Sequence, residues 1–297
     1  REGLWLGLSS LGILKAIPEG KQMEYYVNTE IKRDEERLTL SLIPYDDRHL
    51  LAGTMQGVYL FDTVEKTFRT FASGNLPMYC TDIKKDRNGA FWISTRKGLY
   101  KEYRQEITRM DRTLLPGIES EIIRFSLPLS DGRILVCLNQ KDLYICHPEN
   151  GQALFLNEKF PELHRSRAMS FAIEAKPGKL IFGGQNGLFG YDTDKNKREE
   201  VAWIAGMEKY STKYNCIYTD KDNLWIGTQN GLICHNPGNR KTRRFCKEDG
   251  LPNNCIQGIT TDLNGNLWIS TSCGVGKISR TGKDSYFIAQ LDEKDGV

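Results

Sequence analysis

The chain has 297 residues, 27% of them charged and 39% hydrophobic, which is the balance of a soluble globular protein. The formal net charge is only +3, and there is no arginine-rich stripe or basic tail, so nucleic acid is not expected as a partner. No apolar run approaches the roughly 18 residues that a membrane-spanning helix needs.

A hairpin pattern recurs seven times, beginning near residue 4. Most copies have three apolar residues, a Gly or Ser, a Thr or Leu, and a turn that ends in Gly. Asn186-Gly187 and Asn230-Gly231 are strong hairpin signals, because both residue types tolerate positive φ. Lys141 replaces the turn glycine in the fourth copy. The second positions of the copies lie 41 to 46 residues apart, at Trp5, Leu51, Trp92, Leu135, Ile181, Trp225 and Trp268.

Further strands flank these hairpins. An apolar strand precedes the hairpin in six copies, at about residues 38–44, 79–85, 121–128, 168–174, 214–219 and 256–262. An outer strand follows the hairpin, as at residues 66–72, 107–111, 242–247 and 285–291. Helical periodicity is nearly absent, although the loop 201–213 has room for one short helical turn.

Four antiparallel strands in every 40 to 50 residues are the period of a β-propeller blade. We therefore predict an all-β fold, a seven-bladed β-propeller of four-stranded antiparallel blades that forms a single domain over residues 1–297. The first blade is expected to lack its innermost strand, and the chain is expected to be a fragment of a longer receptor. The tryptophans are predicted to pack between blades, because the strands that carry them are apolar on both faces.

The eight cysteines and four histidines do not predict a metal site. No CxxC is present, and the neighbours Cys146-His147 and Cys234-His235 lack the paired spacing that a structural zinc site needs. No metal and no other cofactor is expected. The cysteines are predicted to be small apolar residues within strands.

Residues 250–275, GLPNNCIQGITTDLNGNLWISTSCGV, resemble the two-component-regulator propeller repeat, and residues 75–99 fit it nearly as well. Residues 214–232 fit from their strand onward, whereas the other copies carry only the hairpin part. The resemblance implies a periplasmic sensor of a Bacteroides-type hybrid two-component system. Such receptors place two propellers and a β-sandwich before a membrane helix, a histidine kinase and a transcription regulator.

The same resemblance implies the partners of the chain. They are a second propeller and a β-sandwich of the same receptor, a second copy in a homodimer, and a mono- or oligosaccharide released from a complex carbohydrate. The chain itself would lie in the periplasm, as the ectodomain of an inner-membrane protein. A diguanylate cyclase stays open as an alternative output module.

The usual strand order of a blade places hairpin turns and interblade loops at one end, which is the default binding face. Aromatic rings with polar neighbours in the loop 201–215 suit a sugar, and cations in the loop 162–169 suit a uronate or sulfate. Core packing of the aromatic residues and solvated loop charges are the alternatives. The candidate ligand-binding residues are Trp203, Lys209, Tyr210, Tyr214, His164, Arg165, Arg167, Arg96, Gln229 and Asn230.

No catalytic residue is predicted. Asp86, Asp220 and Asp262 occupy equivalent positions before their hairpins, so we interpret them as turn formers that bond their own backbone, not as the paired acids of a glycosidase. No nucleophile triad, phosphate loop or metalloprotease motif is present. A sensor is the first hypothesis. The alternatives are a non-signalling carbohydrate- or protein-binding scaffold, and a propeller polysaccharide lyase or glycosidase.

Overall fold

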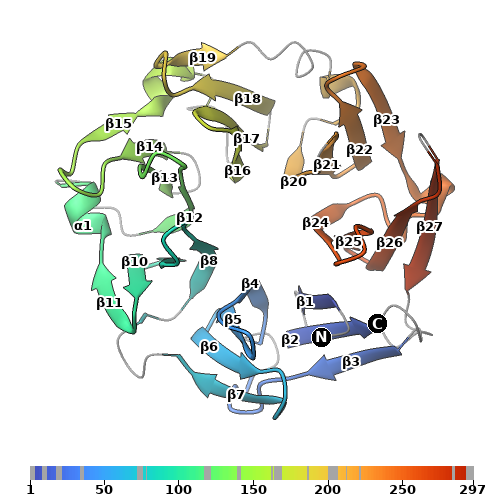
Figure 1. The fold of residues 1–297 in the computed structure, drawn as a ribbon, viewed down its shortest axis with the longest axis horizontal. Coiled ribbons are helices and arrows are strands. Elements are labelled where there is room, and N and C mark those ends of the chain that lie inside the picture. Colours follow the sequence, from blue (N-terminus) through green and yellow to red (C-terminus); the bar gives the residue numbers. More distant parts are fainter. Residues whose placement is uncertain are drawn as a thin grey trace. The chain divides into compact units, whose positions relative to one another are not determined.

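The computed structural model describes residues 4–8, 12–17, 22–33, 37–71, 76–77, 79–116, 122–138, 142–161, 163, 169–185, 187–199, 207–211, 213–220, 222–282 and 285–291. Within these residues the chain forms seven antiparallel sheets, one of three strands and six of four (Figure 1). The predicted fold is confirmed: the protein is a seven-bladed β-propeller whose first blade has three strands.

Blades 1 to 4 follow one another along the first half of the chain. Blade 1 consists of β1 (Leu4–Leu8), β2 (Gly12–Ile17) and β3 (Gln22–Tyr26). Blade 2 consists of β4 (Thr39–Pro44), β5 (His49–Thr54), β6 (Gly57–Asp62) and β7 (Thr67–Thr70). Blade 3 consists of β8 (Cys80–Lys85), β9 (Phe91–Thr95), β10 (Gly98–Tyr103) and β11 (Glu106–Arg109). The short helix α1 (Asp111–Leu114) leads to blade 4, which consists of β12 (Ile123–Pro128), β13 (Ile134–Leu138), β14 (Asp142–Cys146) and β15 (Ala153–Phe155).

Blades 5 to 7 occupy the second half. Blade 5 consists of β16 (Met169–Lys176), β17 (Lys179–Gly184), β18 (Gly187–Asp192) and β19 (Lys197–Glu199). A 3-10 turn at Met207–Lys209 follows, in the loop where one helical turn was predicted. Blade 6 consists of β20 (Tyr214–Thr219), β21 (Leu224–Thr228), β22 (Gly231–Asn236) and β23 (Lys241–Phe245). Blade 7 consists of β24 (Ile256–Thr261), β25 (Leu267–Thr271), β26 (Gly274–Arg280) and β27 (Tyr286–Leu291).

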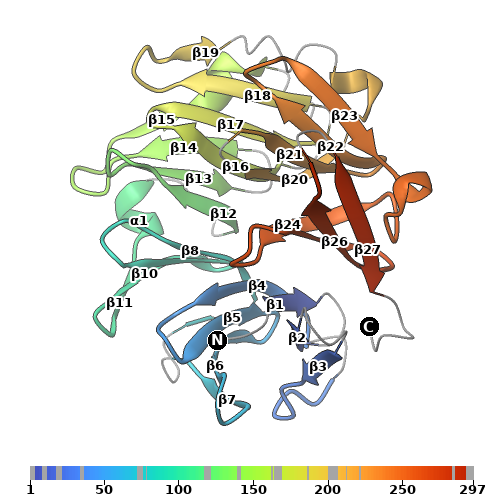
Figure 2. The same ribbon diagram turned by 45° about the vertical axis from the view of Figure 1, so that its right-hand side comes forward.

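The chain divides into two compact units, each described by itself below. Blades 2 to 4 belong to one unit, formed by Trp5–Ala16 and Glu24–Arg165. Blades 5 to 7 belong to the other, formed by Ser166–Val297 with Arg1–Leu4 and Ile17–Met23. Within the second unit, β16, β20 and β24 are neighbours, as Figures 1 and 2 both show. The first strand of each blade is therefore its innermost strand.

A Thr and a Gly shape the hairpin turn between the second and third strands in blades 2, 3, 6 and 7. In blade 6 the Oγ1 of Thr228 donates to the carbonyl of Gly231 at 2.8 Å, and Thr95 and Thr271 donate in the same way to Gly98 and Gly274. Gly231 has a φ of 120°, in the left-handed region that favours glycine. The repeated Thr and Gly of the sequence are thus explained by this turn.

A β-bulge follows the first residue of the innermost strand in blades 2 to 7. The bulged residue turns its side chain out of the ladder. In blade 3, Thr81 donates from Oγ1 to the carbonyl of Ile123 in blade 4 at 2.7 Å. In blade 6, Asn215 donates from Nδ2 to the carbonyl of Ile256 in blade 7 at 2.8 Å. The bulge therefore links neighbouring blades at equivalent positions.

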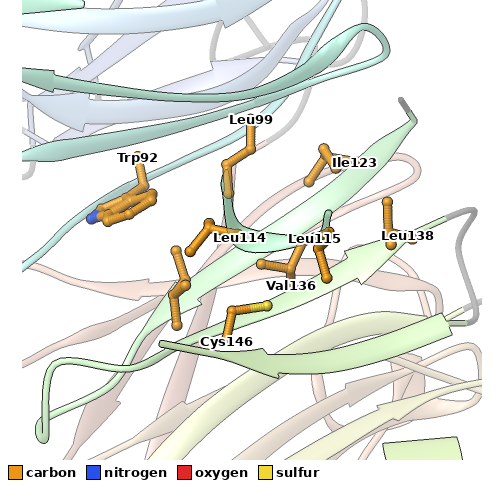
Figure 3. Packing of buried hydrophobic residues seen from close by; sticks show 9 residues of the cluster. Trp92, Leu99, Leu114, Leu115, Ile123, Val136, Leu138 and Cys146 are labelled. Carbon is orange, nitrogen blue, oxygen red and sulfur yellow. The ribbon is translucent and has the colours of Figure 1, made fainter. Parts of the chain in front are cut away.

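Apolar side chains fill the seams, by which we mean the interfaces between consecutive blades. Figure 3 shows the seam between blades 3 and 4, where Trp92 and Leu99 face Ile123 and Val136. Trp92, Trp225 and Trp268 are each 2–3% exposed, which confirms the predicted packing role of the strand tryptophans. The prediction that the cysteines lie within strands is wrong for three of them. Cys246 and Cys255 flank strands in the linker between blades 6 and 7, and Cys273 lies in the hairpin turn of blade 7.

Candidate functional site

The hairpin turns and the interblade linkers lie at one end of the blades, which we call the hairpin-turn end. In blade 6 the amide of Gln229 donates to the carbonyl of Lys213 at 3.4 Å, so the turn touches the linker that enters its own innermost strand. The amide of Gly231 donates to the carbonyl of Asn254, in the linker to the next blade, at 2.7 Å. This arrangement is the one on which the prediction of a binding face was based.

Four of the candidate residues meet at the hairpin-turn end of blade 6. The side-chain amide of Asn230 donates to the carbonyl of Tyr210 at 3.5 Å, which joins the hairpin turn to the linker. The Nζ of Lys209 lies 4.9 Å from the ring centroid of Tyr210. Lys209, Gln229 and Asn230 are exposed, and Tyr210 is half-buried. We call these four residues the blade-6 surface.

Tyr214 does not belong to the blade-6 surface. It is 2% exposed and packs with Leu188, Met207, Ile226 and Ile233 in one hydrophobic cluster. Its ring packs against Met207 of the linker and is covered by protein atoms, so it does not face a ligand. Four further candidates, Trp203, His164, Arg165 and Arg167, lie outside the described residues.

Arg96 lies at the hairpin-turn end of blade 3, in the other compact unit. Its guanidinium carbon is 3.6 Å from the ring centroid of Tyr79, a residue of the linker before β8. The backbone amide of Arg96 also donates to the carbonyl of Tyr79 at 3.2 Å. Arg96 and its neighbour Lys97 are exposed, whereas Tyr79 is half-buried. The sequence did not single out Tyr79, because nothing local predicts that its ring lies under an arginine.

The repeated aspartates lie at the other end of the blades, in the turns that follow the innermost strands; we call this the inner-turn end. Asp220 accepts hydrogen bonds from the backbone amides of Asp222 and Asn223 and from the indole Nε1 of Trp225 at 2.8 Å. Asp86 and Asp262 accept the equivalent bonds, including one from the tryptophan of their own blade at 2.9–3.0 Å. Their interpretation as turn formers is confirmed, and each aspartate also fixes a core tryptophan.

These hydrogen bonds set the ionisation of the turn aspartates. Burial raises the pKa of Asp220, but the donors from Trp225, Asp222 and Asn223 outweigh burial and hold the pKa below its ordinary value of 3.8. The pKa of Asp262 is lowered against burial in the same way. A carboxylate kept ionised and bound to its own turn is a poor general acid, because proton donation needs a raised pKa.

The described residues also contain a cavity of about 220 Å³ at the inner-turn end of the seam between blades 6 and 7. Its walls combine the apolar side chains of Leu267 and Ile278 with the ring of Tyr286. At its rim, Arg280 and Asp222 face each other with 3.9 Å between Nη1 and Oδ2. The sequence analysis missed this cavity, because its residues come from two turns and five strands that only the seam brings together.

Residues 211–230 match the family model of the two component regulator propeller. No match was found among curated protein sequences. No helix of the described chain is long and apolar enough to cross a membrane.

Solved structures show similar folds at low sequence identity. The extracellular domain of BT4673 from B. thetaiotaomicron, described as a hybrid two component system, is 14% identical with a TM-score of 0.54, over 99% of this chain and 48% of that one. A streptogramin B lyase is 14% identical with a TM-score of 0.66, over 97% and 90% of the two chains. The GH74 xyloglucanase from Xanthomonas campestris is 12% identical with a TM-score of 0.67, over 98% and 53%. The present chain thus spans about half the length of the BT4673 extracellular domain.

Proposed function

We propose that this chain is the ligand-sensing propeller of an extracytoplasmic receptor that signals to a cytoplasmic histidine kinase and a transcription regulator. The match of residues 211–230 to the two component regulator propeller carries this proposal. The matched segment contains Gln229 and Asn230, the hairpin-turn residues of the blade-6 surface, and it begins directly after Tyr210. In this proposal residues 1–297 are one propeller domain of a longer periplasmic ectodomain. A second propeller, a β-sandwich and a second receptor copy are its partners.

The ligand that we propose is a mono- or oligosaccharide bound at the hairpin-turn end. The half-buried ring of Tyr210 supplies an apolar face, and the exposed amides of Gln229 and Asn230 supply donors and acceptors beside it. This combination suits a sugar, whose CH groups lie on one face and whose hydroxyls lie at the rim.

Signalling then requires a difference in affinity between two receptor arrangements. A ligand that binds both arrangements equally shifts nothing, however tightly it binds. A shift from 1:99 to 99:1 needs a preference of about 10⁴-fold for one arrangement. The chain contributes the binding surface, and the arrangement that is favoured belongs to the whole receptor.

The side chains that could act in catalysis argue against an enzymatic function. Asp86, Asp220 and Asp262 are engaged with their own backbone and a buried indole. Buried thiols offer no nucleophile, since burial raises the pKa of Cys146 and of Cys216 to about 12. A sensing role therefore fits the side chains better than hydrolysis or elimination does.

The first test is a thermal-shift screen of the chain against neutral and acidic mono- and oligosaccharides, with product analysis of the same samples. A sugar that binds only the folded protein raises the melting temperature. We expect such a rise without cleavage, and a smaller rise for Asn230→Ala. Asn264→Ala is the matched control, because Asn264 is exposed at the inner-turn end. Cleavage would make the protein an enzyme, and the absence of any shift would contradict saccharide binding by this chain.

A further inference from the structure

Tyr79 has a backbone conformation that is costly for its residue type. Its φ is +69°, in the left-handed region where a bulky residue is a genuine outlier. The other described non-glycine residues with positive φ lie in turns between the third and fourth strands of a blade, whereas Tyr79 lies in a linker. Such strain costs on the order of 1–3 kcal/mol and persists only where the surroundings impose it.

Backbone hydrogen bonds to blades 2 and 3 hold Tyr79 in this left-handed conformation. Its amide donates to the carbonyl of Met55 in blade 2 at 2.9 Å, and its carbonyl accepts from Arg96 in blade 3 at 3.2 Å. The linker is also short. From its Leu-Pro pair to the first residue of the innermost strand, it has one residue fewer than the linker into blade 7, where Leu251-Pro252 precedes Ile256. The left-handed turn at Tyr79 makes up for the missing residue.

The consequence is a pre-oriented arginine. Because the ring of Tyr79 lies 3.6 Å from the guanidinium carbon of Arg96, the side chain of Arg96 is stacked on an aromatic face although it is exposed. Stacking uses the flat face of a guanidinium and leaves the N–H groups at its edge for a partner. A stacked arginine also loses less conformational freedom when it binds that partner.

Within the part of the chain that the structure describes, the cations around Arg96 have no acidic partner. Other arginines of this unit are paired, as Arg48 is with Asp62 at 2.6 Å and Arg133 is with Asp131. By contrast, no carboxylate of the described chain forms an ion pair with Arg96, Lys97 or Arg124.

These three cations share one end of blades 3 and 4. Arg124 is the exposed bulge residue of β12, next to Ile123. The Oγ1 of Thr81 donates both to the carbonyl of Ile123 and to the carbonyl of Ser94, two residues before Arg96. The nearby acid Asp82 is held by Lys84 at 3.0 Å. The hairpin-turn end of blades 3 and 4 therefore carries three cations, and the guanidinium of Arg96 is fixed by its stack on Tyr79.

We propose that Arg96, stacked on Tyr79 and flanked by Lys97 and Arg124, forms a subsite for a carboxylate or sulfate group. The fork of a guanidinium matches the geometry of both anions and binds them through paired, charge-assisted hydrogen bonds. Combined with the proposed function, on which this part rests, the subsite makes the sensed ligand an acidic saccharide: a uronate or a sulfated sugar.

Binding of matched sugars tests the proposal. Galactose, galacturonic acid and galactose 6-sulfate differ in their charged group, and sodium sulfate is the anion alone. Titration calorimetry at low ionic strength is expected to show binding of both acidic sugars that weakens with added salt. Arg96→Ala is expected to weaken it at least tenfold, and Arg96→Lys less, because lysine keeps the charge without the fork. Arg240→Ala removes an exposed arginine at the inner-turn end of blade 6 and is expected to change nothing.

Tyr79→Gly tests the positioning role. Glycine adopts positive φ without strain, so this variant is expected to be at least as thermally stable as the wild type while binding sulfate and galacturonic acid more weakly. A purely structural tyrosine would instead lower the melting temperature and leave affinity unchanged.

The outcomes separate the two proposals. Sulfate binding that depends on Arg96, with no added affinity for any sugar, supports the subsite and contradicts saccharide sensing. Equal binding of galactose and galacturonic acid, unaffected by Arg96→Ala, overturns the subsite and leaves the sensor in place. Binding of neither sugar nor sulfate overturns both.

Discussion

The seam between blades 3 and 4 and the seam between blades 6 and 7 are built from the same repeated parts. In each, a buried tryptophan, Trp92 or Trp225, donates its indole N–H to the aspartate of its own inner turn. In each, a bulge side chain, Thr81 or Asn215, reaches the first carbonyl of the next blade. These parts come from the repeat, and both seams therefore share their frame.

The two seams differ in what fills them beyond that frame. Between blades 3 and 4, α1 and the residue that follows it insert Leu114 and Leu115, which are 0% and 3% exposed (Figure 3). At the inner-turn end of this seam, Arg87 donates to the carbonyl of Ser130. Between blades 6 and 7, Tyr286 packs edge-on against Trp225 at 5.4 Å, and the cavity of about 220 Å³ stays open. The repeat thus specifies the frame, and residues between repeats decide whether a seam is closed.

Truncation of the two tryptophans is expected to have the largest effect. Trp92→Ala and Trp225→Ala should each lower the free energy of unfolding by about 3–5 kcal/mol, because each removes a buried aromatic side chain. The smaller loss is expected for Trp225→Ala, where the open cavity beside Tyr286 lets neighbours relax. Urea denaturation measures both. Leu263→Ala, at a side chain that is 94% exposed, is the control. A midpoint that does not move for Trp225→Ala would contradict the packing of its blade.

Leu114→Ala tests the filling of the closed seam. Leu114 is 0% exposed, so a loss of about 2–5 kcal/mol is expected, whereas Leu114→Met conserves volume and should cost less than about 1.5 kcal/mol. Thermal and urea unfolding of both variants provide the measurement. Equal stability of the two variants would mean that α1 does not contribute to the seam.

Asp220→Asn tests the charge that holds Trp225, with a smaller effect. The folded-state pKa of Asp220 is lowered, so its stabilising contribution is complete above the unfolded pKa near 3.8 and is lost as pH falls through the folded pKa. The wild type should therefore lose stability more steeply than Asp220→Asn on acidification below about pH 4. Urea midpoints between pH 7 and pH 2.5 provide the comparison. Parallel profiles would show that this carboxylate is not linked to folding. Asp262→Asn should behave in the same way, because Trp268 repeats the arrangement.

Arg87→Ala is expected to have the smallest effect. Arg87 is exposed, and a single exposed hydrogen bond to the carbonyl of Ser130 contributes about 0.5–1 kcal/mol. The variant opens the inner-turn end of the closed seam and makes it resemble the seam between blades 6 and 7. Urea denaturation at pH 7 checks it. A loss as large as that of Leu114→Ala would mean that the arginine carries part of the core packing.

Much of the frame could be predicted from the sequence. The period of 41 to 46 residues and the alternation within each hairpin predict the blades, because strand burial and turn geometry depend on neighbouring residues. The innermost strands agree with their predicted ranges to within two residues, as β20 at Tyr214–Thr219 and β24 at Ile256–Thr261 do. The role of Asp220 and its equivalents also follows locally, since each aspartate bonds backbone amides two to four residues ahead.

The candidate site was less accessible to sequence reasoning. The prediction that hairpin turns and interblade linkers share one end of the blades is confirmed in blade 6, and Tyr210 and Asn230 do meet there. Tyr214 had the same composition signal as Tyr210, yet it is buried, because it begins β20 and packs with Leu188 and Ile226, whereas Tyr210 lies in the linker before the strand. Whether Tyr210, Asn230 and Arg96 bind a ligand stays a prediction for the experiments above.

By itself, then, the sequence determined the repeat, the hairpins, the Thr–Gly turns of four blades and the aspartate that caps the inner turn of blades 3, 6 and 7. These features depend on backbone preferences and contacts over a few residues. Only the tertiary structure decided that Tyr79 lies under Arg96, that α1 closes one seam, and that a cavity remains in another. Those features depend on which segments from different blades meet in space, and contacts of that kind leave no local pattern along the chain.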